Sequence, residues 1–483
     1  MENTPSAAER QATLRRFAKD HHRPSYHFLP PANWMNDPNG LVQWQGAYHL
    51  FYQYNPKGAW HERVHWGHAV SQDLVHWRDL PVALTPTDGG IDDGGCWSGC
   101  AVNLGDHVRL FYTGVRPQVV CTATSADADL STWRKDPQSL IDGPPPTVNA
   151  GERADFRDPY VWREDDGWYM VMGSREEGEG GLALLYRSDD LCEWTYLHPL
   201  LVGDPSIRDP FWPGTMWECP NFFYVEGLPV LMVSVQDKGK GELRYPAFYA
   251  GDLADWRLVP SQLGKIDHGD TFYAPLTMKD DQGRMLMWGW LQEARSKETQ
   301  RELGWSGVMS LPRELFLHPD GALGQRPAAE VETLRVEHKE HRSVTLKPGG
   351  DNPLGEIRGS SLEIEIGVAP GAEDVFNLSV LTSPDKREET MIRYAGGVVT
   401  LDRSRSSQSE DVVKESYSAS VPMTDGRLNL RVFVDGSVVE IFANGRVCLS
   451  GRVYPLHASS IGVRLTGACQ IEQIDVWSLA SIW

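Results

Sequence analysis

Three acidic residues, Asp37, Asp158 and Glu218, stand at the same place in three copies of one repeating unit of sequence. Each lies nine residues before a glycine that follows an apolar run and marks a tight turn: Gly46, Gly167 and Gly227. Equivalent positions of a circular repeat face one axis, so the spacing predicts that the three carboxyl groups meet in one pocket. Clustered carboxyl groups are suited to acid–base and nucleophilic catalysis.

Each acidic motif also has an ordinary structural explanation. The string around Asp37, Asn-Asp-Pro-Asn-Gly, is an excellent turn sequence. Asp158 follows an arginine and precedes a proline, which would suit a surface ion pair beside a turn, and Glu218 could be solvated. The shared nine-residue offset favours a common pocket over these explanations. In the other two units, Ala274 holds the matching place and Ser98 lies near it.

The first part of the chain repeats with a period of about 60 residues. An Asp-Leu-x-x-Trp motif occurs four times, with its tryptophans 56, 61 and 62 residues apart, and the turn glycines of five units keep a similar spacing. Within the units, runs of aromatic and β-branched residues flank short turns, which is typical of β-hairpins. The repeat therefore predicts a five-bladed β-propeller over residues 25–322.

The pattern changes after about residue 320. Residues 323–345 are charged and compatible with a helix, and we interpret them as a linker. Residues 346–483 contain alternating strands around Asp-Gly and Asn-Gly turns, which predict a β-sandwich. Residues 1–24 form a tail before the propeller, with a short helix expected at about residues 7–19. The predicted fold class is therefore all-β.

The composition limits what the chain binds. Its 483 residues carry a net charge of −20, which argues against nucleic acid and anionic membranes and leaves a neutral substrate open. The first 24 residues lack the apolar region of an export signal, and no apolar run approaches the roughly 18 residues of a membrane span. The seven cysteines are odd in number and scattered, so we expect neither a disulfide framework nor a metal site, and a cytoplasmic location.

The residues around the acidic motifs suit a sugar. Several of the 18 tryptophans lie beside these motifs, and a flat ring with apolar faces matches the mixed surface of a carbohydrate. Tryptophans also fill propeller cores, which better explains those of the Asp-Leu-x-x-Trp motifs. Glycoside hydrolysis needs one ionised and one protonated carboxyl group at the scissile bond, and crowded acids acquire different proton affinities.

Taken together, the motifs resemble those of glycoside hydrolase family 32, which contains invertases, sucrose-6-phosphate hydrolases, and enzymes that cleave inulin and levan. The resemblance runs from about residue 25 to the end of the chain. It implies a five-bladed propeller followed by a β-sandwich, a retaining glycosidase, and no metal or organic cofactor. Its three main motifs are Trp34-Met35-Asn36-Asp37-Pro38-Asn39-Gly40, Phe156-Arg157-Asp158-Pro159 and Glu218-Cys219-Pro220.

The resemblance also implies a role for each acidic residue. Asp37 would attack C2 of a fructosyl unit, and Glu218 would act as general acid and then as base. Asp158 would hold fructose hydroxyls and stabilise the transition state, and the adjacent Arg157 is expected to keep it ionised. The positions expected to contact the sugar are Asn36, Gln53, Trp60, Trp97, Ser98, Arg157 and Trp288.

The sequence leaves several alternatives open. The leading hypothesis is a β-fructofuranosidase acting on sucrose or short fructo-oligosaccharides, with sucrose 6-phosphate, inulin and levan as alternative substrates. A fructosyltransferase would share the covalent intermediate and differ only in the acceptor. A non-catalytic carbohydrate-binding protein belongs to a different class, and the presence of all three carboxyl groups argues against it. Homo-oligomers formed through the sandwich also remain open.

Overall fold

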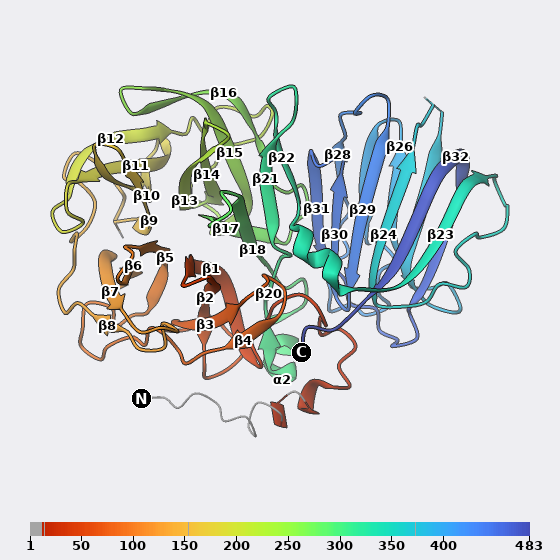
Figure 1. Cartoon of the computed structure of the whole chain (residues 1–483), viewed down its shortest axis with the longest axis horizontal. Coiled ribbons are helices and arrows are strands. Elements are labelled where there is room, and N and C mark those ends of the chain that lie inside the picture. Colours follow the sequence, from red (N-terminus) through yellow and green to blue (C-terminus); the bar gives the residue numbers. More distant parts are fainter. Residues whose placement is uncertain (1–11, 14, 153, 372) are drawn as a thin grey trace.

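The computed structural model describes residues 12–13, 15–152, 154–371 and 373–483. Five small antiparallel sheets surround an axis at one end of the molecule, and a larger β-domain lies beside them (Figure 1). The prediction of a five-bladed propeller followed by a β-sandwich is confirmed. The part of the chain that the structure describes contains no helix of the length and apolarity that crossing a membrane requires.

Each blade is an antiparallel sheet whose strands follow one another along the chain. The first blade contains β1 (Asn33–Trp44), β2 (Ala47–Asn55), β3 (His65–Ser71) and β4 (Trp77–Asp79). The second contains β5 (Cys96–Asn103), β6 (Val108–Gly114), β7 (Val119–Ser125) and β8 (Arg134–Lys135). The third contains β9 (Phe156–Glu164), β10 (Gly167–Glu176), β11 (Gly180–Ser188) and β12 (Thr195–Val202).

The last two blades follow the same order. The fourth contains β13 (Met216–Val225), β14 (Leu228–Asp237), β15 (Glu242–Ala254) and β16 (Arg257–Lys265). The fifth contains β17 (Phe272–Lys279), β18 (Met285–Leu291), β20 (Val308–Met309), β21 (Arg313–Leu317) and β22 (Leu323–Pro327). A short helix, α2 (Lys297–Leu303), lies between β18 and β20 in the chain.

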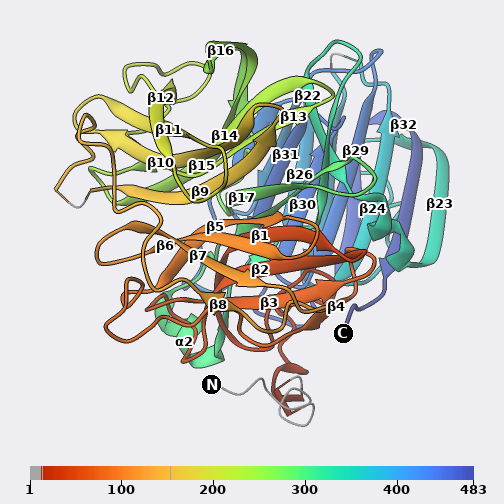
Figure 2. The ribbon, with the colours of Figure 1, turned by 60° about the vertical axis from the view of Figure 1, so that its left-hand side comes forward.

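The first strands of the five blades form the inner ring of the propeller. Each of β1, β5, β9, β13 and β17 contacts the first strand of the next blade, and the five gather around the centre in both ribbon views (Figures 1 and 2). The ring is closed by β19 (Trp305–Ser306), which leaves the fifth unit and pairs in parallel with β1. Residues from opposite ends of the propeller sequence are thereby held together.

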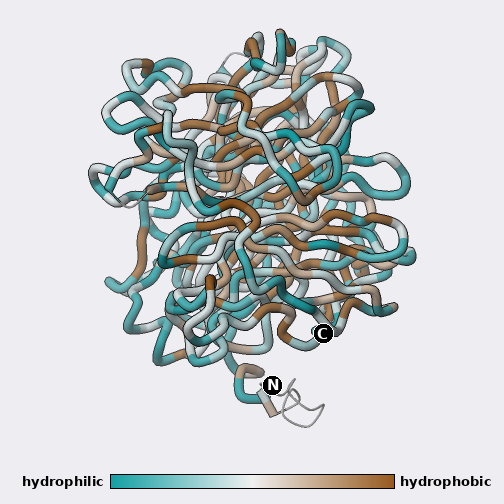
Figure 3. Tube along the Cα trace, turned by 90° about the vertical axis from the view of Figure 1, so that its left-hand side faces the viewer, coloured by the Kyte–Doolittle hydropathy of each residue, from teal (hydrophilic) through white to brown (hydrophobic). Residues whose placement is uncertain are grey.

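Apolar side chains fill the space between the blades. Brown, hydrophobic segments run through the interior, whereas the loops at the rim are largely hydrophilic (Figure 3). Large aromatic side chains such as Trp66, Trp217 and Trp305 are almost completely buried. Close packing of this kind keeps the inner strands in fixed positions, which a pocket built from five separate strands requires.

The C-terminal domain consists of two layers that share one long strand. β32 (Gly462–Leu479) pairs with one layer through its first half and with the other through its second half. The first layer contains β25 (Val375–Thr382), β26 (Thr390–Ala395), β27 (Val398–Asp402) and β28 (Tyr417–Ser420). The second contains β23 (Arg335–Leu346), β24 (Ser361–Val368), β29 (Leu428–Asp435), β30 (Val438–Ala443) and β31 (Val447–Arg452).

The segment expected to be a linker is instead part of both domains. Residues 323–327 form the outer strand β22 of the fifth blade, Ala329–Leu334 form the 3₁₀ helix η1, and β23 is an edge strand of the sandwich. Because β23 is exposed along most of its length, it carries charged residues without an apolar alternation. That charge pattern suggested a linker.

Of the expected helix at 7–19, residues 12–13 and 15–17 are helical, and 1–11 and 14 lie outside the described residues.

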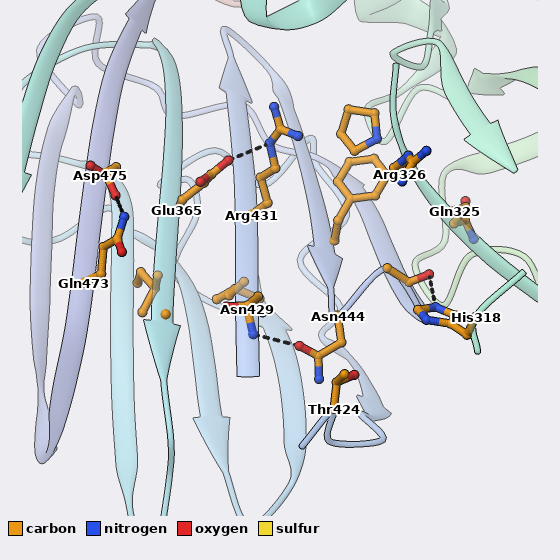
Figure 4. A pocket seen from close by; sticks show the side chains of 16 residues that line it. His318, Gln325, Arg326, Glu365, Thr424, Asn429, Arg431, Asn444, Gln473 and Asp475 are labelled. Atoms are coloured by element: carbon orange, nitrogen blue, oxygen red, sulfur yellow. Dashed lines mark hydrogen bonds and ion pairs between the residues drawn. The ribbon is translucent and has the colours of Figure 1, made fainter. Parts of the chain in front are cut away.

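A buried polar network joins the propeller to the sandwich. His27, ahead of the first blade, lies 2.9 Å from Asp435 and 3.0 Å from Glu440 of the sandwich. Glu440 also pairs with Arg313 of the fifth blade, and all these side chains are buried. Beside this junction lies a groove of about 350 Å³ whose polar side chains, such as Glu365 and Arg431, pair with one another (Figure 4).

Candidate active site

The first strand of every blade is irregular at the place where its motif lies. Pairing with the second strand shifts register between Met35 and Pro38, Trp97 and Gly99, Arg157 and Tyr160, Glu218 and Asn221, and Tyr273 and Leu276. A β-bulge turns side chains away from the regular alternation of a strand. Asp158 and Cys219 also have φ of 62° and 46°, a left-handed conformation that concentrates at functional sites in residues other than glycine.

The bulged strands present their side chains to one pocket of about 320 Å³. It brings together most of the residues predicted from the sequence: Asn36, Asp37, Gln53, Trp97, Ser98, Arg157, Asp158 and Glu218. Five further residues complete its wall: Trp34, His61, Leu243, Tyr273 and Trp290. The three carboxyl groups therefore share one cavity, as their motifs predicted.

The structural register of Asp158 differs from that of the other two acids. Gly46 and Gly227 lie within their turns, because Trp44 pairs with Ala47 and Val225 pairs with Leu228. The turn of the third blade instead ends before Gly167, which pairs with Glu164. Counted along the chain from these closing pairs, Glu218 matches Asp37, whereas Asp158 lies one residue nearer to its turn. The nine-residue spacing was misleading here because Gly167 occupies a different position of its turn from the other two glycines.

Asp37 is held by two neutral donors. Ser98 Oγ donates to Asp37 Oδ2 at 2.6 Å, and Asn36 Nδ2 donates to Asp37 Oδ1 at 3.0 Å. Trp34 Nε1 in turn donates to Asn36 Oδ1 at 2.7 Å, which fixes the orientation of the Asn36 amide. Burial raises the pKa of Asp37 to about 6, although both donors favour the ionised form. At neutral pH this carboxylate is ionised and hydrogen-bonded.

Asp158 does not behave as its neighbour in sequence suggested. Burial raises its pKa to about 7, and the charge of Arg157 only partly offsets that effect. Its carboxylate accepts a hydrogen bond from the backbone of Cys219 at 2.9 Å. Arg157 therefore favours the ionised form of Asp158, as expected, but it does not outweigh burial, because the arginine is directed at other carboxylates.

Arg157 binds Glu218 and Asp155. Its Nε and Nη2 lie 3.2 and 3.0 Å from Glu218 Oε1, and its Nη1 lies 2.7 Å from Asp155 Oδ1. The second oxygen of Glu218 accepts a hydrogen bond of 2.7 Å from the hydroxyl of Tyr273. Both oxygens of the Glu218 carboxyl group are thus oriented by fixed donors.

One thiol links the two aspartates. Cys219 Sγ lies 3.6 Å from Asp37 Oδ2 and 3.6 Å from Asp158 Oδ2. Burial and the neighbouring carboxylates raise the pKa of this thiol well above its usual value, so it is protonated. A neutral side chain thus contacts both aspartates.

The two remaining predicted sugar contacts lie elsewhere. Trp288 is 1% exposed and packs edge-to-face against Trp77 in the core, so it does not line the pocket. Trp290, two residues further along β18, lines it instead. Trp60 lines an adjoining pocket that shares Trp34, His61 and Trp290 with the first.

Sequence reasoning missed several wall residues because nothing local distinguishes them. Tyr273 and Leu243 line the pocket but lie in segments without any of the acidic motifs. Trp288 and Trp290 are the same residue type on the same strand, so the sequence alone does not distinguish them. Only packing against the first blade decides that one is core and the other is wall.

Comparisons with known proteins agree with this geometry. Residues 27–327 match the model of the glycosyl hydrolases family 32 N-terminal domain, and residues 330–478 match the family 32 C-terminal domain. A sucrose-6-phosphate hydrolase of Zymomonas mobilis is 36% identical, with 94% of this chain and 92% of that protein covered. A raffinose invertase of Escherichia coli is 34% identical, with 89% of each chain covered. The crystal structure of fructan 1-exohydrolase IIa from Cichorium intybus superimposes with a TM-score of 0.84 at 28% identity, covering 95% of this chain and 98% of that one.

Proposed function

Because this chain belongs to glycosyl hydrolase family 32, we propose that it is a retaining β-fructofuranosidase that releases fructose from sucrose or short fructo-oligosaccharides. The observation that carries the proposal is the single pocket that Asp37, Asp158 and Glu218 line together. Hydrolysis with retention needs two carboxyl groups at the scissile bond, one to attack and one to protonate the leaving oxygen.

In the first step, a carboxylate oxygen of Asp37 attacks C2 of the fructosyl unit. The bond from C2 to the bridging oxygen breaks, and Glu218 transfers its proton to that oxygen, so the leaving sugar departs with a free hydroxyl. The product on the protein is a fructosyl ester of Asp37. Ser98 and Asn36 support this role, since their hydrogen bonds hold the attacking carboxylate in place.

In the second step, Glu218 removes a proton from water while the water oxygen attacks C2. The ester bond to Asp37 breaks, fructose leaves with the configuration it had at the start, and Glu218 regains its proton. Asp158 holds hydroxyls of the fructosyl ring and stabilises positive charge on it as the bonds break. Arg157 and Tyr273 orient Glu218 for both transfers.

The walls support a furanose in the pocket. Trp34, Trp97 and Trp290 supply flat apolar surface, whereas the carboxyl groups and Gln53 offer hydrogen bonds to hydroxyls. The cytoplasmic location and the self-association considered from the sequence remain predictions.

Product stereochemistry tests the proposal. In NMR spectra taken immediately after sucrose is added, β-fructofuranose should appear first, because two displacements restore the configuration at C2. Asp37→Asn and Glu218→Gln should each lower kcat by at least about 100-fold, and both variants should still unfold in one cooperative thermal transition, which shows an intact fold. Asp189→Asn, at an exposed surface carboxylate, is the matched control. First appearance of the α-anomer, or near-normal hydrolysis by either pocket variant, would rule the mechanism out.

A further inference from the structure

The groove beside the domain junction is separate from the catalytic pocket. Its volume of about 350 Å³ is close to the 320 Å³ of the pocket proposed to hold one fructosyl unit, and the two have no lining residue in common. One wall comes from the fifth blade, with His318 and Arg326, and the other is the sandwich sheet of β24, β29 and β32 (Figure 4). A molecule in this groove would contact both domains without occupying the catalytic pocket.

A glycine forms the floor of the groove. Gly367 in β24 lies opposite Asn429 of β29 and Gln473 of β32, so the three residues form one row across the sheet. Directly opposite residues present their side chains on the same face of a sheet. A Cβ built on Gly367 would lie 3.6 Å from Asn429 Oδ1 and 3.9 Å from Gln473 Cβ. The absent side chain therefore leaves a shallow hollow with an amide on each side.

The charged side chains of the groove are already paired. Four charged residues line it, and each has a partner: Glu365 lies 3.1 Å from Arg431, Arg326 lies 2.8 Å from Glu314, and Asp475 lies 2.8 Å from His338. Burial lowers the pKa of His318, which is therefore neutral at neutral pH. Within the described part of the chain, the groove thus offers no unpaired charge to an ion, and it favours a neutral ligand.

Three neutral groups in the groove have hydrogen-bonding capacity to spare. Among the described residues, no hydrogen bond engages the side-chain amide of Asn429, the hydroxyl of Thr424 or the side-chain oxygen of Gln473. The backbone that carries them is fixed by Asn444, whose Oδ1 accepts from the backbone of Asn429 at 2.7 Å and whose Nδ2 donates to Pro422 O at 2.9 Å. The three groups are therefore in place before any ligand binds.

We propose that this groove is a non-catalytic binding site for a neutral oligosaccharide. A sugar hydroxyl both donates and accepts hydrogen bonds, which matches the free amides and hydroxyl, and the glycine hollow gives room for a sugar ring. A peptide strand finds no free edge on this wall, because β24 and β29 are each paired on both sides. A chain held here stays at the surface of the enzyme between encounters with the catalytic pocket, which raises its effective concentration there.

Affinity electrophoresis in native gels tests the site, with Glu218→Gln present in every protein so that no probe is hydrolysed. The gels contain either inulin, a fructan, or soluble starch, a glucan, as two sources of a neutral sugar chain. Gly367→Val fills the hollow, and because the built Cβ meets only ordinary contacts, the sheet should remain intact. It should weaken retardation by the bound polymer at least about 10-fold in dissociation constant. Any contribution from the catalytic pocket is the same in all the proteins.

The matched control is Gly239→Val, in a turn of the fourth blade where a built Cβ meets only Asp237 Oδ1 at 3.5 Å. Its dissociation constant should not change. Asn429→Ala is a second groove variant, and it decides the matter if Gly367→Val does not fold. In the background with Glu218 intact, both groove variants should keep the kcat/KM of the unmodified enzyme for sucrose.

Retardation by either polymer that both groove variants weaken supports the site, and the polymer that causes it identifies the chain as a fructan or a glucan. No retardation in either gel overturns the proposal, as does retardation that neither groove variant weakens. The site does not depend on the proposed function: an unmodified enzyme that fails to hydrolyse sucrose would remove the fructosidase and leave the electrophoretic result to decide the groove.

Discussion

Arg157 Nη2 lies 3.0 Å from Glu218 Oε1, so the proposed acid–base residue is held by an arginine from the neighbouring blade. Asp155 holds that arginine from the other side at 2.7 Å and also pairs with Arg175 and Lys238. Asp155 is 1% exposed and lines no part of the pocket. We interpret it as a positioning residue that acts on Glu218 through Arg157.

The first prediction concerns that positioning role. Asp155→Asn removes the charge that fixes Arg157, and we expect kcat to fall about 10–100-fold with a smaller change in KM, as for the loss of one charged hydrogen bond. The pH dependence of kcat should change as well, because a freed Arg157 alters the field at Glu218. Glu177→Gln, at an exposed partner of Arg175, is the matched control. An unchanged pH profile in a folded Asp155→Asn protein would leave Asp155 a purely structural residue.

The second prediction concerns the hydrogen bond from Ser98 to Asp37. Ser98→Ala removes a 2.6 Å donor that favours the ionised carboxylate, so the pKa of Asp37 should rise above about 6. Because the attacking group must be ionised, the acidic limb of kcat/KM should move to higher pH. Ser234 is a buried serine whose hydroxyl has no hydrogen-bond partner among the described residues, so Ser234→Ala is the control. If both variants keep the acidic limb of the unmodified enzyme, that limb does not belong to Asp37.

The third prediction concerns stability and pH. The pKa of Asp37 is about 6 in the folded protein and 3.8 when it is free, so between these values the folded state binds more protons than the unfolded state. Stability contributed by this group is therefore complete below about pH 4 and lost as the pH rises to about 6. Asp37→Asn removes the ionisable group and therefore this loss of stability at high pH. The Tm of the variant should exceed that of the unmodified enzyme by a few degrees at pH 8 but not at pH 4.

Asp92 provides the comparison, because it is buried like Asp37 but its pKa is shifted in the opposite direction. The pKa of Asp92 is lowered because Lys135 and several other donors outweigh the effect of its burial. Its stabilising contribution is present above about pH 4 and lost in acid, so Asp92→Asn should lower Tm at pH 8. Thermal melts at both pH values measure the two variants together. A lower Tm for Asp37→Asn at pH 8 would contradict the burial argument.

The fourth prediction separates the two tryptophans of β18. Trp290→Ala should raise KM and lower kcat/KM, because this ring lines both pockets. Trp288→Ala should instead destabilise the fold by about 3–5 kcal/mol, the usual effect of removing a large buried side chain. Chemical denaturation and steady-state kinetics on both variants distinguish the roles. A KM effect confined to Trp288→Ala would reverse the assignment.

Much of the fold was predictable because the repeat is long and regular. The apolar hairpins and the period of about 60 residues can be seen directly in the sequence. Five consecutive β-sheet units leave few arrangements in which the edges of the sheets are protected. The linker prediction was wrong because β23 is an exposed edge strand, and an edge strand needs no apolar alternation. Pairing with β32, far along the chain, makes it a strand.

The acids of the site were also predictable, but their relations to one another were not. Asp158 reached the predicted pocket one residue out of register with Asp37 and Glu218, because glycine spacing does not reveal where a glycine stands in its turn. Arg157 was expected to pair with its neighbour in sequence. The structure directs it instead to Glu218 and Asp155, since the bulged strand turns adjacent side chains in different directions.

By itself, the sequence determined the repeating β architecture and the identity of the three carboxyl groups, since both follow from short-range spacing and residue chemistry. Only the tertiary structure decided which donors hold each acid and which tryptophan forms the pocket wall. Those properties depend on distances and burial between strands of different blades, and no local pattern of residues encodes them.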